Sequence, residues 1–450
     1  RGKAKVLPSI QAAMGCQCLL LPNSIDSIGA LAPMNLLIRD ALLDPALSLL
    51  PTLDSYRHDL AFSDSEFVTL GIRRINSFHP SGRSFLQSVR QCHLTEVSLK
   101  AYFGAASSAR RLAMIHELNT TVSRKVVAAA DRFADFPQLA GRDVLALDGH
   151  DVRHATHEPP ATMTSGRREV PDTVTGLFLR DLRSGAARVL AQTQGHQHEW
   201  AAVKAQPWSD FHWQPNAKGT ILVNDPVAVD FEFLRGAKFK GGFTVITRTK
   251  QNLVVREARP LKWDKQHRHN QGVLSDERVR FGEPGEFRRI RYRDPKSGEI
   301  YEFLTTEFHL PPGIIAQLYR LRWDIEKFFD VCENLLAEKR AWGTGPVAAQ
   351  VQNEFLVLAH NLLLLLSGRL EVQEGIRDEK VEAKYEAALK IRNAAARLKG
   401  MKVSPWVRVL RRITRWSSQF TRWVQDAIIH GWEWNTAVAK LRPLMRAYMR

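Results

Sequence analysis

Two aspartates close short apolar runs in this chain, and a glutamate follows on a stretch that favours a helix. Asp148 ends the run of residues 144–147, and Asp225 ends a second run of the same kind. Apolar runs of this length are typical of buried strands. Glu326 lies within residues 319–326, whose composition is strongly helical. Two carboxylates at strand ends and one on a helix are the oxygen ligands that a paired-magnesium site requires.

The order of elements between residues 140 and 250 predicts an α/β domain. Strands are expected at residues 143–148, 175–181, 186–193, 220–224 and 243–248, with helices within 198–211 and 231–236. Three strands in a meander, followed by alternating helix and strand, is the order of a ribonuclease H-like core. Three more strand-like runs between residues 251 and 312 indicate a β-rich insertion. The predicted fold class is therefore α/β: a ribonuclease H-like core with a β-rich insertion, flanked by helical N- and C-terminal regions.

The helix predicted around Glu326 has a polar stripe and an apolar face. Four polar residues follow one another at intervals of three, four and seven: Tyr319, Arg322, Glu326 and Glu333. On a helix with 3.6 residues per turn, these intervals place them on one side. The opposite side carries four residues suited to a core, namely Ile325, Phe329, Cys332 and Leu336. We expect the apolar face to pack and the stripe to meet a substrate; a solvated stripe without function is the alternative.

The charge of the chain predicts a polyanionic partner. A formal net charge of +17 favours nucleic acid over a membrane surface. Basic residues such as Arg110 and Arg111 on an N-terminal helix indicate DNA contact or, equally, a solvated basic face. No run approaches the roughly 18 apolar residues of a membrane helix. The longest candidate, residues 355–366, is interrupted by His360 and Asn361 and is interpreted as a buried helix, so we expect no membrane contact and a cytoplasmic location.

The polar stripe resembles the signature of a known family. The spacing Tyr319-x-x-Arg322-x-x-x-Glu326 is similar to the Tyr-Arg-Glu-Lys signature of bacterial DDE transposases of insertion-sequence family four. Residues 321–329 resemble the surroundings of that signature closely. One position departs from it, because the family expects Lys seven residues after the Glu and this chain has Glu333. A carboxylate there would repel DNA, and Arg340, a further seven residues along, is a candidate replacement.

Both aspartates lie in segments that resemble further motifs of this family. Residues 147–149, Leu-Asp-Gly, are similar to the first-aspartate motif, and residues 223–225 followed by the strand at 243–248 are similar to the second. Asp230 is a rival for Asp225, although it lies past the predicted strand. Three histidines soon after Asp148 suggest a metal cluster, but exposed histidines beside a phosphate-binding site are the favoured interpretation: His150, His154 and His157.

The resemblance implies a DNA transposase that cuts transposon ends and joins them to target DNA by two-metal phosphoryl transfer. Asp148, Asp225 and Glu326 would be the catalytic residues and the ligands of Mg²⁺, which Mn²⁺ can replace. Four residues would contact DNA: Tyr319, Arg322, Trp323 and Arg340, with Trp323 expected to pack rather than to stack on a base. The implied partners are transposon-end inverted-repeat DNA and target DNA, bound by a homodimer on paired ends at the bacterial nucleoid. A catalytically impaired DNA-binding descendant and a ribonuclease H-like nuclease are the alternatives.

The motifs divide the chain into five expected segments. These are residues 1–135, a helical region expected to bind DNA ends; 140–250, the first part of the core; 251–312, the β-rich insertion; 313–368, the second part of the core with the helix of Glu326; and 369–450, a helical region for dimerisation and DNA contact.

Overall fold

The computed structural model describes residues 36–57, 59–127, 131–153, 173–194, 199–225, 229–249, 253–282, 284–294, 298–336, 342–343, 345–376 and 418–447, with five single residues between 387 and 398. The N-terminal helices are α1 (Ile38–Leu47), η1 (Leu50–Thr52), α2 (Asp64–Ile75), α3 (Gly82–Gln91), α4 (Leu99–Ala106), α5 (Ala109–Lys125) and η2 (Pro137–Leu139). The strands are β1 (Asp143–Arg153), β2 (Thr173–Asp181), β3 (Ala187–Gln194), β4 (Thr220–Asn224), β5 (Phe243–Arg248), β6 (Glu257–Pro260), β7 (Val273–Arg280), β8 (Phe287–Arg293) and β9 (Ile300–Thr305). The remaining helices are α6 (Glu199–Lys204), η3 (Trp208–Phe211), α7 (Phe231–Phe239), η5 (Arg268–Asn270), α8 (Pro312–Leu321), α9 (Asp324–Leu335), α10 (Pro346–Glu374), α13 (Ser418–His430) and α14 (Trp434–Ala447).

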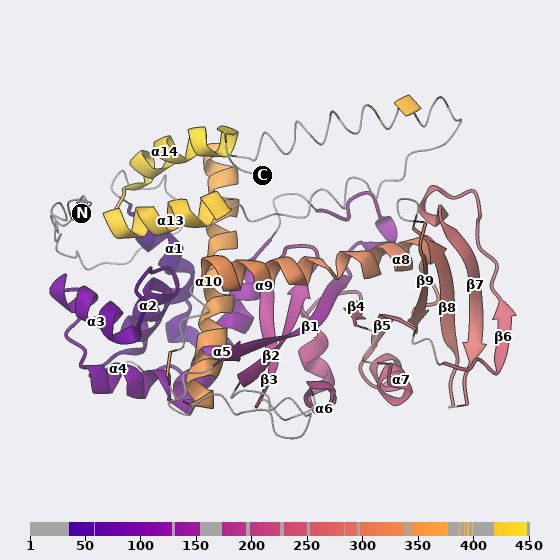
Figure 1. Cartoon of the computed structure of the whole chain (residues 1–450), viewed down its shortest axis with the longest axis horizontal. Coiled ribbons are helices and arrows are strands. Elements are labelled where there is room, and N and C mark those ends of the chain that lie inside the picture. Colours follow the sequence, from indigo (N-terminus) through magenta and orange to yellow (C-terminus); the bar gives the residue numbers. More distant parts are fainter. Residues whose placement is uncertain are drawn as a thin grey trace, which may run out of the picture.

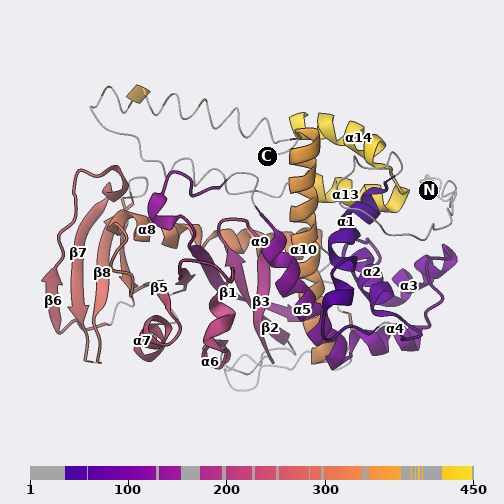
Figure 2. The ribbon, with the colours of Figure 1, turned by 180° about the vertical axis from the view of Figure 1, so that it is seen from behind.

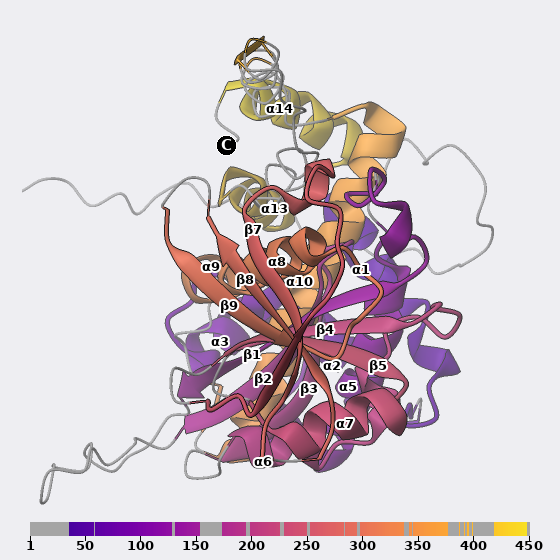
Figure 3. The same ribbon diagram turned by 90° about the vertical axis from the view of Figure 1, so that its right-hand side faces the viewer.

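A mixed sheet of nine strands forms the centre of the α/β structure (Figure 1), in the order β3-β2-β1-β4-β5-β9-β8-β7-β6. The strands β1, β2 and β3 form the expected antiparallel meander, and β4 and β5 run parallel to β1. The strand β9 pairs antiparallel with β5, so the segment expected as an insertion continues the same sheet. This pairing covers the edge of β5, whose backbone groups would otherwise lack partners. Figure 3 shows the twist of successive strands.

Each face of the sheet packs against its own set of helices. Successive side chains of a strand point to opposite faces. Val144 and Ala146 of β1 therefore belong to the core shared with α8, α9 and α10. Leu145 and Leu147 belong to a second core, shared with residues of α6 and α7. By this alternation, Asp148 lies on the face that α8 and α9 cover.

The 29-residue helix α10 stands between the N-terminal helices and the sheet (Figures 1 and 2). It is the one helix within the described ranges that is long and apolar enough to cross a membrane, and 61% of its most apolar window is buried inside the protein. Two of its buried polar side chains are hydrogen-bonded to neighbouring elements: Asn119 of α5 donates to the Glu354 carboxylate over 2.6 Å, and Asn361 donates to the Ala187 carbonyl over 2.8 Å. The interpretation of residues 355–366 as a buried helix is thus confirmed.

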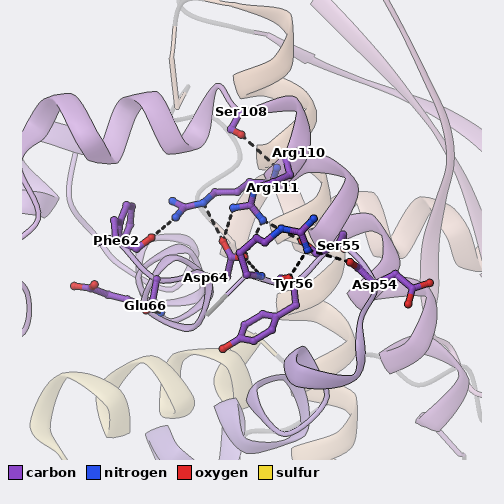
Figure 4. A network of polar contacts seen from close by, with 11 residues as sticks. Asp54, Ser55, Tyr56, Phe62, Asp64, Glu66, Ser108, Arg110 and Arg111 are labelled. Atoms are coloured by element: carbon purple, nitrogen blue, oxygen red, sulfur yellow. Dashed lines mark hydrogen bonds and ion pairs between the residues drawn. The ribbon is translucent and has the colours of Figure 1, made fainter. Parts of the chain in front are cut away.

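The basic pair on α5 forms ion pairs with a buried aspartate of α2 (Figure 4). Asp64 of α2 is fully buried and accepts from Arg110 Nη2 over 2.7 Å and from Arg111 Nε over 3.1 Å. Burial alone would raise the pKa of Asp64, but the hydrogen bonds from Arg110 and from the Arg57 backbone N–H, with the charges of both arginines, hold it below its usual value. Arg110 and Arg111 therefore join α5 to α2. Arg111 is buried, so it is not part of a solvated basic face, and DNA contact by this helix stays a prediction.

A close backbone contact at Gly313 sets the start of α8, and we predict that Gly313→Ala destabilises the protein. A Cβ at this position would lie 1.8 Å from the carbonyl oxygen of His269. Relieving that overlap must shift α8 away from η5, at a cost of roughly 1–3 kcal/mol in the free energy of unfolding. Denaturant titration measures this cost. The control is Gly368→Ala in α10, where a Cβ meets nothing within 4 Å and should stabilise by about 0.5–1 kcal/mol. Equal effects of the two substitutions would contradict the prediction.

Candidate active site

Asp148 lies inside a strand rather than at its end. The parallel pairing of β1 with β4 ends at Leu147 and Asn224, but β1 continues to Arg153 by pairing with β2 alone. The sequence expectation ended this strand too early, because the polar residues after Asp148 do not reveal that β2 supports the extension. Asp148 is still the first residue of β1 beyond the parallel pairing, where the sheet opens beside it.

Asp225 follows the last residue of β4, as expected. Because Leu147 and Asn224 are paired in register, the next residue of each chain segment brings Asp148 and Asp225 to the same opening of the sheet. Both side chains lie on the face covered by α8 and α9, since each is two residues beyond a residue of that core, Ala146 or Val223. Thr247 of β5 donates to the Asp225 backbone carbonyl over 3.1 Å, which fixes the chain just after the strand.

The helix expected to be continuous from residue 319 to 326 is broken at Arg322 and Trp323. Helix α8 ends at Leu321, and α9 begins at Asp324. The Arg322 N–H bonds to the Tyr319 carbonyl over 3.1 Å, an i→i−3 contact that tightens the last turn. Asp324 is buried and accepts from Arg132 Nη1 over 2.8 Å. This ion pair holds the start of α9 against the N-terminal region, which no periodicity within the helix signals.

The guanidinium of Arg322 brings the three carboxylates together. Its Nη1 lies 2.5 Å from Asp148 Oδ2 and 3.8 Å from Glu326 Oε1, and its Nη2 lies 3.9 Å from Asp225 Oδ2. The Arg322 side chain is 7% exposed, whereas those of Asp225 and Glu326 are almost half exposed. The three acids selected from the sequence therefore converge on one buried cation, although they come from three separate elements. We call Asp148, Asp225 and Glu326, with Arg322, the acidic site.

Burial raises the pKa of Asp148 to about 6. Arg322 acts in the opposite direction by stabilising the charged form, and the carboxylates of Glu326 and Asp225 raise the pKa further. Asp148 is thus ionised at neutral pH, in a place where a carboxylate depends on a nearby cation.

Two other residues of the predicted DNA contact lie beside the acidic site. Tyr319 packs against Phe303 with ring centroids 5.0 Å apart, and burial raises the pKa of its hydroxyl. Trp323 is 64% exposed, so the expectation that it packs is wrong. Arg340 lies outside the described residues.

Glu333 faces the strand extension that carries Asp148. Its carboxylate is 4.0 Å from Nε2 of His150, and the His150 ring stacks on Phe329 with centroids 4.6 Å apart. His150 is held between β1 and α9 rather than exposed, which corrects the interpretation made for it; His154 and His157 lie outside the described residues. Glu333 therefore lies against the extension of β1, next to a residue two places from Asp148.

Asp230, the rival of Asp225, belongs to a different structure. It is the N-cap of α7 and accepts from the Phe233 N–H over 2.9 Å and from Lys204 Nζ over 2.9 Å. Burial would raise the pKa of Asp230, but these two bonds and the Lys204 charge lower it. A capping role accounts for this aspartate, and Asp225 is the one that faces Arg322.

Arg248 is a neighbour of the acidic site that the sequence did not single out. It is the exposed last residue of β5, and its guanidinium lies over the Tyr301 ring, 5.1 Å from the centroid. Its charge and that of Asp225 both act on the Tyr319 hydroxyl, so the three groups are close together. In the sequence, Arg248 stands out only as an arginine at the end of a buried strand, within the segment 243–248 that resembles the second-aspartate motif.

The donor set of the acidic site fits a hard divalent cation. Three carboxylates share one positive group, and carboxylate oxygens are the ligands that Mg²⁺ and Mn²⁺ prefer. As placed here, no three His, Cys, Asp or Glu side chains in the described part of the chain are grouped closely enough to hold a metal ion. The Arg322 guanidinium stands between the acids as the cation of the site.

Comparison with known proteins adds an independent observation. Residues 215–362, about one third of the chain, match a family model described as the transposase DDE domain. The matched region contains Asp225, Arg322 and Glu326, while Asp148 lies before it. No curated protein matches the chain. The likeness of residues 215–362 to a transposase DDE domain supports a DDE transposase.

Proposed function

We propose that the protein is a cut-and-paste DNA transposase of insertion-sequence family four, which cleaves the ends of its element and joins them to target DNA. The observation that carries the proposal is the convergence of Asp148, Asp225 and Glu326 on one cation at the open end of β1 and β4. The match of residues 215–362 to the transposase DDE domain supports it. The Tyr-Arg-Glu spacing supports the assignment to family four.

The strand order supports a ribonuclease H-like core. The first five strands lie in the order β3-β2-β1-β4-β5, with only β4 and β5 parallel to β1. Acidic residues then fall at the end of β4 and at the matching level of β1, and a helix after the sheet provides the third. The β-rich segment lies between the second and third acids and extends the sheet away from this opening.

In the proposed mechanism, Asp148, Asp225 and Glu326 hold Mg²⁺ ions, with Mn²⁺ as a substitute. Bound there, the metal would activate the attacking water or 3′-hydroxyl and stabilise the leaving oxygen. The other side chains of the site would bind the DNA substrate. The carboxylates supply oxygen ligands, Arg322 offers a planar fork of donors that suits a phosphate, and Tyr319 and Arg248 add a hydroxyl and a charge beside it. The exposed Trp323 ring is available to stack on a base.

The substrate implied is DNA with both ends of the element present. Cutting two ends in concert needs two acidic sites, so we propose a homodimer on paired inverted-repeat ends, with the C-terminal helical region contributing to the dimer contact. Three basic residues of that region proposed to lie nearer DNA, Arg411, Arg412 and Arg415, are outside the described residues.

The test begins with the DNA that flanks the gene, which should carry matching inverted repeats. Duplexes that span each junction are then incubated with the protein and Mg²⁺. The proposal expects strand breaks at the junction between repeat and flank, and joining of the freed 3′ ends to a second DNA. Breaks at unrelated positions, with no joining, would instead favour a ribonuclease H-like nuclease.

Binding to DNA should weaken steeply as salt rises. A chain of net charge +17 that neutralises about six phosphates releases their counterions, so the plot of log affinity against log salt should have a slope near −5. Fluorescence anisotropy at several salt concentrations measures this slope. A slope near zero would remove nucleic acid as the principal partner.

A further inference from the structure

The place of Arg322 in the acidic site has a consequence for metal binding. We propose that its guanidinium is a built-in counter-cation that a divalent metal must displace, so that Arg322 sets the affinity of the site for metal. The proposal rests on the proposed function, which assigns Asp148, Asp225 and Glu326 as metal ligands. The proposal gives Arg322 a second role, because the proposed function assigns this residue only to binding a phosphate.

The contacts of Arg322 are those of a competitor for the site. One guanidinium lies within 4 Å of all three carboxylates, and its two terminal nitrogens divide the acids between them. Ligands of one metal ion must point at a common centre, and that centre is filled by the side chain. The acids thus form no metal-holding group in the described structure, although their chemistry suits one.

The rest of the side chain indicates that this position is held by charge. The Arg322 Nε is buried and has no hydrogen-bond partner in the described part of the protein. A buried N–H without an acceptor is unfavourable, so the site is not built to satisfy the whole guanidinium. Charge attraction to the acids, above all the 2.5 Å contact with Asp148, and a hydrogen bond with Tyr319 keep it in place.

Displacement would couple two steps of substrate recognition. Once a metal neutralises the acids, the guanidinium loses its partners and becomes available to a DNA phosphate, for which its planar fork is suited. A phosphate that binds the guanidinium in turn frees the acids for metal. Because such coupling is reciprocal, metal and DNA should each strengthen the binding of the other through this residue.

The experiment measures Mn²⁺ binding by calorimetry without DNA, so its readout does not depend on catalysis. The variant is Arg322→Gln, and the matched control is Arg320→Gln. Arg320 is two residues away on α8 and contacts Asp294 at 3.6 Å; among the described residues it forms no ion pair with the acidic site. An opposite charge beside a carboxylate typically changes its proton affinity by 1–3 pKa units. We therefore expect Mn²⁺ to bind at least about tenfold more tightly to Arg322→Gln than to the wild-type protein, and unchanged to Arg320→Gln.

Further variants keep the outcomes distinguishable. Arg322→Lys retains the charge but has only one terminal nitrogen to place among the acids. Its Mn²⁺ affinity should therefore lie between those of Arg322→Gln and the wild type. If Arg322→Gln does not fold, the affinity of Arg322→Lys tests the proposal. An affinity of either variant equal to or below that of the wild type overturns the counter-cation. If Asp225→Asn, added to the wild type or to Arg322→Gln, leaves Mn²⁺ binding unchanged, the metal site of the proposed function fails, and the counter-cation fails with it.

Discussion

Asp148→Asn, Asp225→Asn and Glu326→Gln should each reduce cleavage of element-end DNA by at least about 1000-fold, the largest effect expected for single substitutions in this chain. Each amide keeps the shape of the acid but removes the charge that would hold the metal. Metal-ion catalysis contributes several kcal/mol, and each 1.36 kcal/mol corresponds to a factor of ten in rate. Single-turnover cleavage with Mg²⁺ measures the loss.

The control for these variants is Asp230→Asn, which should cleave like the wild type. Asp230 caps α7, and Asn is as good an N-cap as Asp. DNA binding by the three site variants should persist, because removing negative charge does not weaken attraction to phosphate. Cleavage retained in Asp225→Asn but lost in Asp230→Asn would show that the second acid is Asp230.

Glu333→Lys should increase cleavage of element ends by about tenfold. Position 333 lies on the side of α9 that faces β1, where Glu333 approaches His150. A carboxylate there repels a DNA phosphate, and a lysine would attract it. The change is worth roughly 1–3 kcal/mol, the scale of a charged hydrogen bond. Cleavage rates compared at equal protein and DNA concentrations measure the gain.

Two companion variants identify the source of that gain. Glu333→Gln removes the repulsion without adding attraction. Its cleavage rate should therefore lie between those of the wild-type protein and Glu333→Lys. If Arg340 already holds the phosphate, Glu333→Lys changes little and Arg340→Ala is severe. If neither Glu333→Lys nor Arg340→Ala changes the cleavage rate, this side of α9 does not reach DNA. If the wild-type protein cleaves slowly and Glu333→Lys restores cleavage, the protein is better described as a catalytically impaired descendant.

Local patterns located the strands and helices of the core, but not the extension of β1 or the break between α8 and α9. The apolar runs at β1, β4 and β5 and the turn-bounded runs of β2 and β3 were visible because strands buried by the sheet need continuous apolar residues. The apolar face of α9 was visible for the same reason, and its residues Ile325 and Cys332 are buried as expected. Asp148, Asp225 and Glu326 were selected because each lies beside or within such a pattern and in a segment that resembles a motif of the transposase family.

Side-chain partners far apart in sequence were not accessible to this reasoning. In the sequence, Arg110 and Arg111 are simply basic residues on a helix. Only the structure shows that both pair with Asp64, which lies 46 and 47 residues away. The first residue of α9, Asp324, pairs with Arg132 across 192 residues.

The sequence by itself singled out Asp148, Asp225 and Glu326 as candidate acids, because strand and helix patterns are local and a charge at their ends is conspicuous. It also determined the basic character that favours DNA. Only the tertiary structure decided that β9 continues the sheet from β5, that Asp230 is a cap, and that Arg322 lies inside the ring of acids rather than free on a helix stripe. The physical reason is that sheet pairing and ion pairing depend on distance in space, and a linear pattern records only distance along the chain.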